Sequence, residues 1–337
     1  MNNNNQHLAI LNEQQALDKA ANILSGQTQH VFVTGAGGFL GIAICRLLRS
    51  ANINVTGFAR GHYPELSQMG VNMIQGDISD FSQVKSAMKS CDLVFHVAAK
   101  AGVWGSLDDY FKPNVQGTQN IINACQSLGI SRLVYTSTPS VTFAGVDEVN
   151  IDESQPYADN YLNYYGQTKA QAEQLVLAAA KTSFKKNAAA KISTDNSTAE
   201  ESNSPKEPLK TVALRPHLIW GPNDPHLVPR VLERAHAGKL KLVGKEDKLV
   251  DTIYVDNAAY AHILAAIALA EPKSKCNGKA YFISNDEPIT MAAMLNKILA
   301  CDGLPPVCKR VPSAIAYAVG ATLETVYKLF NKKQEPI

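Results

Sequence analysis

A glycine-rich turn between an apolar strand and a helix constrains the fold of this chain more than any other feature. The stretch "VFVTGAGGFLG", which begins at residue 31, spaces three glycines three residues apart and adds a fourth beside the second. Glycine permits the tight turn and lets backbone N–H groups approach a pyrophosphate, while the helix N-terminus favours negative charge. The motif therefore predicts a dinucleotide site rather than a merely structural turn, formed by Gly35, Gly37, Gly38, Phe39, Leu40 and Gly41.

The segments around this turn alternate between short β-rich runs and longer helical patterns. Such alternation is typical of βαβ units and predicts an α/β fold with a doubly wound parallel sheet, a Rossmann fold. Helices are expected near 39–50, 81–89, 115–128 and 165–181. Strands are expected at 31–34, 53–59, 71–74, 92–97, 132–137 and 211–214.

Composition shifts divide the chain into three regions. Residues 1–29 form a polar N-terminal extension with one short helix near 12–25. Residues 30–215 are expected to form the dinucleotide-binding domain, and the Ser-, Asn- and Lys-rich stretch 182–210 is expected to be a disordered insertion within it. Residues 216–337 are expected to form a smaller substrate lobe, with 251–270 returning to the first domain.

Charge and cysteine usage exclude several classes of protein. The formal net charge is +2 and no basic block is present, so nucleic-acid binding is not expected. The six cysteines are scattered without metal-ligand spacing, so we expect reduced thiols and no metal site. Neither a signal peptide nor a transmembrane stretch is evident, and 311–330 reads as an amphipathic helix. We therefore expect a cytoplasmic protein.

Two positions near the glycine motif bear on the choice of dinucleotide. The second strand ends with Ala59 and Arg60, where an NAD-specific site usually carries an acidic residue. An uncharged residue followed by arginine accommodates a 2′-phosphate, which favours NADP(H) over NAD(H), although Arg60 could also be an ordinary solvated side chain. Asp77 is placed to contact the adenine edge, or else to act as an N-cap of the next helix.

A tyrosine four residues before a lysine stands in a helical run, "NYYGQTKAQAEQ". Tyr165 and Lys169 share one helix face at this spacing, and no other tyrosine of the chain has a lysine four residues on. A phenol with a pKa near 10 is poorly matched to proton transfer at neutral pH, and a neighbouring ammonium lowers that pKa. The spacing fits a catalytic acid–base pair, but a chance surface pair has the same spacing.

Motifs along the chain match a known family. In order, "TGAGGFLG", "GDISD", "VFHVAAKAG", "NVQGTQNII", "LVYTSTPSV", "YYGQTK" and "LRPHLIWGP" resemble the extended short-chain dehydrogenase/reductases, and most of all their 3β-hydroxysteroid dehydrogenase-like branch. The resemblance covers about residues 30 to 290. Within that branch, "AAKAGVWGS" and "LRPHLIWGPNDPHLVPR" look most like bacterial enzymes of olefin biosynthesis.

The resemblance implies roles for individual residues. Tyr165 would be the general acid of ketone reduction, and Lys169 would lower its pKa and hold the nicotinamide ribose. Thr138 would orient the substrate carbonyl, unless its neighbour Ser137 does so. Asn114 would support the site, unless it is a simple helix-start residue. Further cofactor contacts are implied at Ile78, Ala98, Ala99, Lys100 and Pro216.

The implied reaction is NAD(P)H-dependent reduction of the 3-ketone of a 2-alkyl-3-oxoalkanoic acid to the 3-hydroxy acid. The alternatives are a 3β-hydroxysteroid or sterol dehydrogenase and a non-catalytic, dinucleotide-binding scaffold subunit. Trp104 and Trp220 could line an apolar channel or pack in the core. A β-keto acid needs a cation for its carboxylate, for which the candidates are Lys100, His226 and Arg230.

The resemblance also bears on assembly. Relatives often form homodimers through helices equivalent to 107–128 and 161–181, and a homodimer is expected here. Family members continue past the point where this chain stops, so the substrate lobe is expected to be truncated. A pathway enzyme could then bind the apolar helix 311–330.

Overall fold

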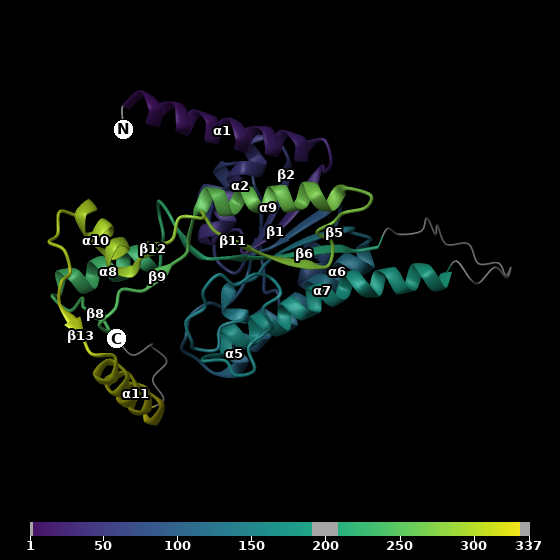
Figure 1. Cartoon of the computed structure of the whole chain (residues 1–337). Helices are drawn as coiled ribbons and strands as arrows, with labels where there is room; N and C mark the ends of the chain where they lie inside the picture. The colour runs from purple at the N-terminus through teal and green to yellow at the C-terminus, as the bar shows by residue number, and fades with distance from the viewer. Residues whose placement is uncertain (1–2, 191–207, 331–337) are drawn as a thin grey trace, which may run out of the picture. The chain divides into compact units, whose positions relative to one another are not determined.

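A seven-stranded parallel sheet forms the centre of the molecule. The computed structural model describes residues 3–190 and 208–330. The strands lie in the order β11-β6-β5-β4-β1-β2-β3, and each neighbouring pair is parallel (Figure 1). Their bounds are β1 (His30–Thr34), β2 (Asn54–Ala59), β3 (Asn72–Gln75), β4 (Leu93–His96), β5 (Arg132–Thr136), β6 (Lys210–Pro216) and β11 (Lys279–Ile283). The expected doubly wound sheet is confirmed.

Helices cover both faces of this sheet. One face carries α2 (Phe39–Ser50) and α9 (Val255–Ala270), and the other carries α4 (Phe81–Ala87), α6 (Gly117–Leu128) and α7 (Tyr164–Ala190) (Figure 1). The central strands β1, β4, β5 and β6 are buried on both faces, which explains their continuous apolar runs. The remaining elements are α1 (Asn3–Ser25), α3 (Pro64–Gln68), α5 (Leu107–Phe111), the π-helical turn η1 (Lys112–Gln116) and the 3₁₀ turn η2 (Pro139–Val141).

The structure differs from the sequence expectations in three places. Strand β11 was not expected, because its side chains are only half-buried and its apolar pattern is short. Helix α7 runs to Ala190, past the expected end at 181, and most of the expected insertion, residues 191–207, lies outside the described residues. Helix α1 begins at Asn3 rather than near residue 12 and packs on α2 through Ala20, Ala21 and Leu24.

The chain separates into two compact units. Unit 1 comprises Met1–Ala101, Ser106–Pro216 and Asp256–Ile283, so the returning segment is 256–283 rather than the expected 251–270. The return supplies α9 to one sheet face and β11 to one sheet edge. Unit 2 comprises Gly102–Gly105, His217–Val255 and Ser284–Ile337.

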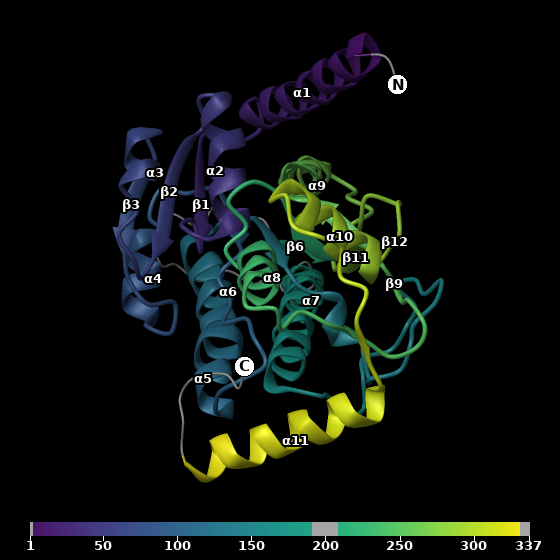
Figure 2. The same cartoon turned by 90° about the vertical axis from the view of Figure 1, so that its left-hand side faces the viewer.

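Unit 2 is built from short elements around a small core. Helices α8 (Leu227–His236) and α10 (Met291–Cys301) pack together, with Val231, Leu242, Leu295 and Leu299 buried (Figure 2). Three two-stranded pairs complete it: β10 (Thr252–Tyr254) with β7 (Leu218–Trp220), β12 (Ile289–Thr290) with β9 (Leu249–Val250), and β13 (Arg310–Val311) with β8 (Leu242–Val243). The last helix is α11 (Ser313–Leu329). Over the described residues, no helix combines the length and apolarity that a membrane crossing requires.

Candidate active site

The glycine-rich turn forms a close-packed cradle between β1 and α2. Gly35 has φ +65°, and a Cβ placed on it would lie 2.9 Å from the Cα of Ala98. A Cβ on Gly41 would lie 2.1 Å from the Gly35 carbonyl oxygen, so helix and turn touch directly. Gly38 is the N-cap of α2 and offers no side-chain cap, which leaves the first N–H groups of the helix available. The cradle therefore fits a pyrophosphate group.

Tyr63 covers the outer side of this turn. A Cβ on Gly37 would lie 2.2 Å from the Tyr63 ring, so the ring lies directly against the Gly37 backbone. A Cβ on Gly61 would likewise lie 2.8 Å from the Tyr63 hydroxyl. The sequence reasoning did not identify Tyr63, because a single aromatic residue in a loop gives no periodic signal.

Arg60, expected to favour NADP(H), and Asp77, expected to contact the adenine edge, are both exposed. Arg60 follows β2 directly, and its carbonyl oxygen accepts a hydrogen bond of 2.7 Å from the Gln75 side chain. Asp77 accepts the backbone N–H of Ser79 at 2.8 Å and does not cap α4. The N-cap of α4 is Asp80, which accepts from the Gln83 backbone. The cap alternative for Asp77 is therefore wrong, since the N-cap of α4 lies three residues later.

Lys169, the second member of the candidate pair, is buried on α7. Its ammonium donates to the Thr136 carbonyl at 2.7 Å and lies 4.1 Å from the centre of the Tyr135 ring. Only 2% of the residue is exposed. Burial lowers the pKa of Lys169 from 10.5 to about 7, against an opposing effect of the Glu173 carboxylate.

Tyr165 lies one helical turn before Lys169 on α7. Burial raises the pKa of its phenol above 10, and a hydrogen bond with the Thr138 side chain partly offsets this rise. We expected the Lys169 ammonium to lower this pKa, but Thr138 is the group that does so here. The ammonium is held instead by the Thr136 carbonyl and the Tyr135 ring.

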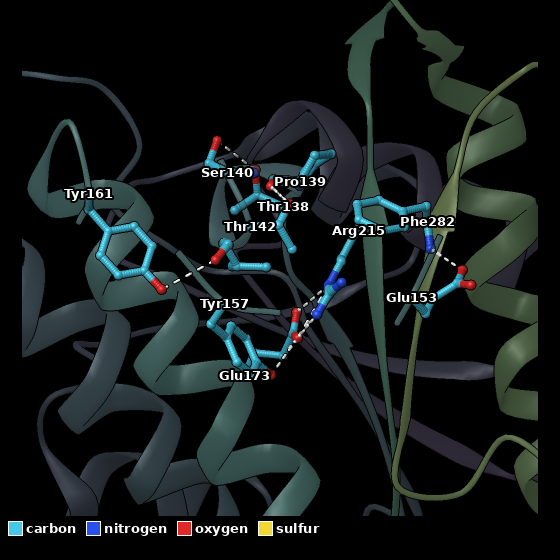
Figure 3. A network of polar contacts seen from close by, with 11 residues as sticks. Thr138, Pro139, Ser140, Thr142, Glu153, Tyr157, Tyr161, Glu173, Arg215 and Phe282 are labelled. Atoms are coloured by element: carbon cyan, nitrogen blue, oxygen red, sulfur yellow. Dashed lines mark hydrogen bonds and ion pairs between the residues drawn. The ribbon is translucent and has the colours of Figure 1, made fainter. Parts of the chain in front are cut away.

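Thr138 and Ser137 both carry a hydroxyl that could orient the substrate carbonyl. Thr138 hydrogen-bonds with Tyr165. Its hydroxyl also reaches the Ser140 hydroxyl at 3.2 Å (Figure 3). The Ser137 hydroxyl is buried without a hydrogen-bond partner among the described residues, although its backbone N–H donates to the Leu214 carbonyl. The geometry brings Thr138, rather than Ser137, to the phenol.

Asn114 is buried inside a continuous helical run from α5 through η1 to α6. Its side chain accepts the Lys100 backbone N–H at 2.7 Å and donates to the Lys100 carbonyl at 3.1 Å and to the Thr168 hydroxyl at 3.0 Å. It is thus not a helix-start residue. It connects the segment after β4, where Ala98, Ala99 and Lys100 lie, to the turn of α7 that carries Tyr165 and Lys169.

His96, a buried histidine that the sequence did not reveal as a site residue, extends this hydrogen-bond chain to β1. His96, at the end of β4, contacts the Thr34 hydroxyl at 2.7 Å and the Thr118 hydroxyl at 2.9 Å. Thr118 itself donates to the Asn114 carbonyl, and Thr34 accepts the N–H groups of Val97 and Ala98. These contacts fix the proton on Nε2, which donates to Thr118, while Nδ1 accepts from Thr34. Burial, together with the Lys169 charge, lowers the pKa of His96 to about 3, so the ring is neutral.

The candidate substrate residues are divided between the two units. Lys100 belongs to unit 1, where its ammonium lies 5.1 Å from the centre of the Tyr110 ring. Trp104, His226 and Arg230 belong to unit 2. Trp104 contacts Tyr327 edge-on, and Trp220 contacts Tyr254 in the same way while remaining 41% exposed, so Trp220 is not a core residue.

Two remaining expected cofactor contacts lie within the sheet unit. Ile78 is buried and packs where a Cβ on Gly117 would come within 2.7 Å of it. Pro216 is buried at the end of β6, opposite Ile283 of β11.

Comparisons with known proteins agree with this geometry. The model of the 3-beta hydroxysteroid dehydrogenase/isomerase family matches residues 32–307. The 2-alkyl-3-oxoalkanoate reductase of Shewanella oneidensis is 62% identical over 325 residues, covering 96% of this chain and 78% of the relative. The enzyme of the same name from Stenotrophomonas maltophilia is 48% identical, covering 91% and 86%. The human decarboxylating sterol-4-alpha-carboxylate 3-dehydrogenase is 35% identical, covering 81% and 66%.

Solved structures share the fold. UDP-glucose 4-epimerase from Thermus thermophilus, in complex with NAD, is similar with a TM-score of 0.66 and 25% identity, covering 84% of this chain and 86% of that one. MoeE5 in complex with UDP-glucose and NAD gives a TM-score of 0.62 and 25% identity, covering 84% and 85%. The chain belongs to the 3-beta hydroxysteroid dehydrogenase/isomerase family, whose members are oxidoreductases with the extended short-chain dehydrogenase/reductase fold.

Proposed function

We propose that this protein is an NAD(P)H-dependent reductase that converts the 3-ketone of a 2-alkyl-3-oxoalkanoic acid into the 3-hydroxy acid. The observation that carries the ketone chemistry is the half-buried Tyr165 side chain, whose phenol hydrogen-bonds with Thr138 while Lys169 lies one turn further along α7. The substrate class rests on the 62% identity to a reductase of that name.

Each residue of the site has a distinct task in this reaction. The glycine cradle and the N-terminus of α2 would hold the pyrophosphate, and the bound nicotinamide supplies the hydride to the ketone carbon. Tyr165 donates its proton to the ketone oxygen, and Thr138 donates a hydrogen bond to the same oxygen. The raised pKa of Tyr165 keeps the phenol protonated at neutral pH, which suits an acid that acts in reduction.

We propose that this site prefers NADP(H), which carries a 2′-phosphate on the adenosine ribose, over NAD(H), which lacks it. Ala59 and the exposed Arg60 lie where an acidic residue would repel a 2′-phosphate, which supports the preference. We expect Arg60→Ala to raise the KM for NADPH about tenfold, the effect of losing one charge-assisted hydrogen bond, and to leave the KM for NADH unchanged. Steady-state kinetics with both dinucleotides measure this, and equal changes would contradict it.

The substrates stated in the names of two relatives share a chemical feature. In a 2-alkyl-3-oxoalkanoate, the carboxylate sits on the carbon next to the ketone carbon, and that same carbon bears the alkyl group. A sterol-4-carboxylate that reacts at position 3 has the same arrangement. We propose that a β-keto carboxylate with a substituted middle carbon is the group this site receives. Lys100, His226 and Arg230 are the proposed carboxylate partners, with Trp104 against the alkyl chain.

A sterol dehydrogenase is the second candidate function. The 35% identity to the human sterol-4-alpha-carboxylate 3-dehydrogenase supports it, and the family description fits it as well. The same Tyr165 would then act as a base in oxidation of the 3-hydroxyl group.

One pair of assays separates these functions. NADPH oxidation is followed with a 2-alkyl-3-oxoalkanoic acid, and NAD(P)⁺ reduction with a 3β-hydroxysteroid and a 4-carboxysterol. We expect turnover on the keto acid and at least tenfold lower kcat/KM on its ethyl ester, which lacks the charge. Turnover on the sterols alone would favour the second function. Dinucleotide binding without any turnover would mean a non-catalytic scaffold.

We further propose that the chain acts in the cytoplasm as a homodimer, paired through the helices of 107–128 and 161–181. Sedimentation equilibrium tests the dimer, and a monomer at micromolar concentration would contradict it.

A further inference from the structure

A buried ion pair lies one helical turn beyond the catalytic pair. The Glu173 carboxylate is fully buried on α7 and accepts from Arg215 Nη2 at 2.6 Å and from Arg215 Nε at 3.1 Å (Figure 3). The Tyr157 hydroxyl also donates to it, at 2.8 Å. Three donors therefore hold this carboxylate as an anion in the interior.

Aromatic rings fix the arginine of this pair. The Arg215 guanidinium carbon lies 4.9 Å from the centre of the Phe282 ring and 5.7 Å from that of Tyr157. Arg215 and Phe282 are opposite residues of the β6–β11 pair. The Glu153 side chain accepts the Phe282 N–H at 2.9 Å, so the loop that carries Glu153 and Tyr157 closes over the pair (Figure 3). The Glu173 carboxylate thus accepts hydrogen bonds from Arg215 on the sheet and from Tyr157 on the loop.

Helix α7 places this carboxylate in line with the catalytic residues. Tyr165, Lys169 and Glu173 stand at successive four-residue steps, which puts them on one face of the helix. In the part of the chain that the structure describes, Lys169 makes no direct ion pair, and its ammonium contacts a carbonyl and an aromatic ring. Glu173 is the next residue along that face.

We propose that Glu173, fixed by Arg215 and Tyr157, is a positioning residue whose carboxylate keeps the buried Lys169 side chain in its ammonium form. The inference rests on the proposed function, in which Lys169 acts as a cation beside Tyr165.

The charges around Lys169 agree with this role. Burial lowers the pKa of Lys169 to about 7, and Glu173 is the group that raises it. Apart from Glu173 and Arg215, the titratable groups that contact this part of α7 or belong to it carry no charge at neutral pH. His96 has a pKa of about 3, and the phenols of Tyr135, Tyr157 and Tyr165 have pKa values raised by burial. Arg215, whose positive charge would disfavour the ammonium, is bound to the carboxylate itself.

The sign of the expected effect follows from these charges. Without the carboxylate, Lys169 would lose its proton at lower pH, because only burial would then act on it. The activity that depends on the ammonium would disappear at correspondingly lower pH.

Three variants test this. Glu173→Gln removes the charge and keeps the shape. Glu173→Gln combined with Arg215→Met removes both charges, so that no unpaired guanidinium remains if the single variant fails to fold. Glu153→Gln is the matched control, because this carboxylate belongs to the same network but accepts from the Phe282 backbone N–H rather than from Arg215.

The readout is the pH profile of kcat for keto-acid reduction between pH 5.5 and 9. We expect both Glu173 variants to lose activity at lower pH than the parent, with kcat about tenfold lower at pH 8, and Glu153→Gln to follow the parent profile. Folded Glu173 variants that follow the parent profile would overturn the proposal.

A second readout does not depend on turnover. The side-chain nitrogen of Lys169 is titrated by NMR in ¹⁵N-lysine-labelled protein, with Lys169→Met identifying the signal. A titration shifted to lower pH in the Glu173 variants supports the proposal even if the substrate assignment is wrong. An unchanged titration contradicts it whatever the substrate.

Discussion

At the scale of single residues, the site depends on which hydroxyl meets the substrate. Thr138 and Ser137 are adjacent in sequence, and both are buried. Only Thr138 hydrogen-bonds with the Tyr165 phenol, while the backbone of Ser137 is tied to Leu214. A donor aimed at the developing oxyanion is among the larger single contributions to such a reaction.

We therefore expect Thr138→Val to lower kcat about 100-fold and Ser137→Ala to change kcat less than about threefold. Steady-state kinetics on the keto acid measure both, and Thr138→Ser serves as the control that retains the hydroxyl. The reverse order of effects would assign the role to Ser137.

At the scale of elements, a hydrogen-bond chain joins the first strand to helix α7. It runs from Thr34 through His96 and Thr118 to Asn114, which binds Thr168 on α7. Every donor in this chain has an acceptor, so a single break leaves a buried group unsatisfied.

Thr118→Val breaks this hydrogen-bond chain with the least change in side-chain shape, because it removes only the hydroxyl that accepts from His96. We expect a loss of about 1–3 kcal/mol in the free energy of unfolding, measured with urea. Thr118→Ser retains the hydroxyl and should lose less than about 1 kcal/mol. Equal losses in the two variants would mean that the hydroxyl is not what stabilises this element.

The sequence predicts the elements better than it predicts these contacts. The glycine turn and six of the seven strands follow from local patterns, as does the shared face of Tyr165 and Lys169. His96 stands inside an apolar run, and Glu173 and Arg215 are of types that usually face solvent, so no local pattern marks them as buried partners. Their contacts join residues up to 67 positions apart along the chain, as between Arg215 and Phe282, which only the folded sheet brings together.

At the scale of the whole molecule, buried histidines make the fold sensitive to acid. Burial lowers the pKa of His96 to about 3 and that of His262 to about 4. His262 accepts from the Thr136 hydroxyl and donates to the Ala258 carbonyl, so it is fixed as a neutral ring. Between pH 6.5 and about 4 the unfolded chain binds protons that the folded chain does not, and stability must fall as the pH falls.

We expect the free energy of unfolding to decrease by up to about 2.7 kcal/mol per pH unit near pH 5, the effect of two protons. Denaturant unfolding from pH 7 to pH 5 measures this slope. His262→Gln should reduce it by about half, and a stability independent of pH over this range would contradict neutral burial of the two rings.

The measurement that tests the whole account most directly compares the parent protein with Tyr165→Phe in one experiment. NADPH binding is followed by fluorescence, and NADPH oxidation is then followed after addition of a 2-alkyl-3-oxoalkanoic acid. The account predicts that both proteins bind NADPH with similar affinity, and that the variant reduces the keto acid at least about 100-fold more slowly. Equal rates in the two proteins would remove Tyr165 from the reaction and contradict the proposed mechanism.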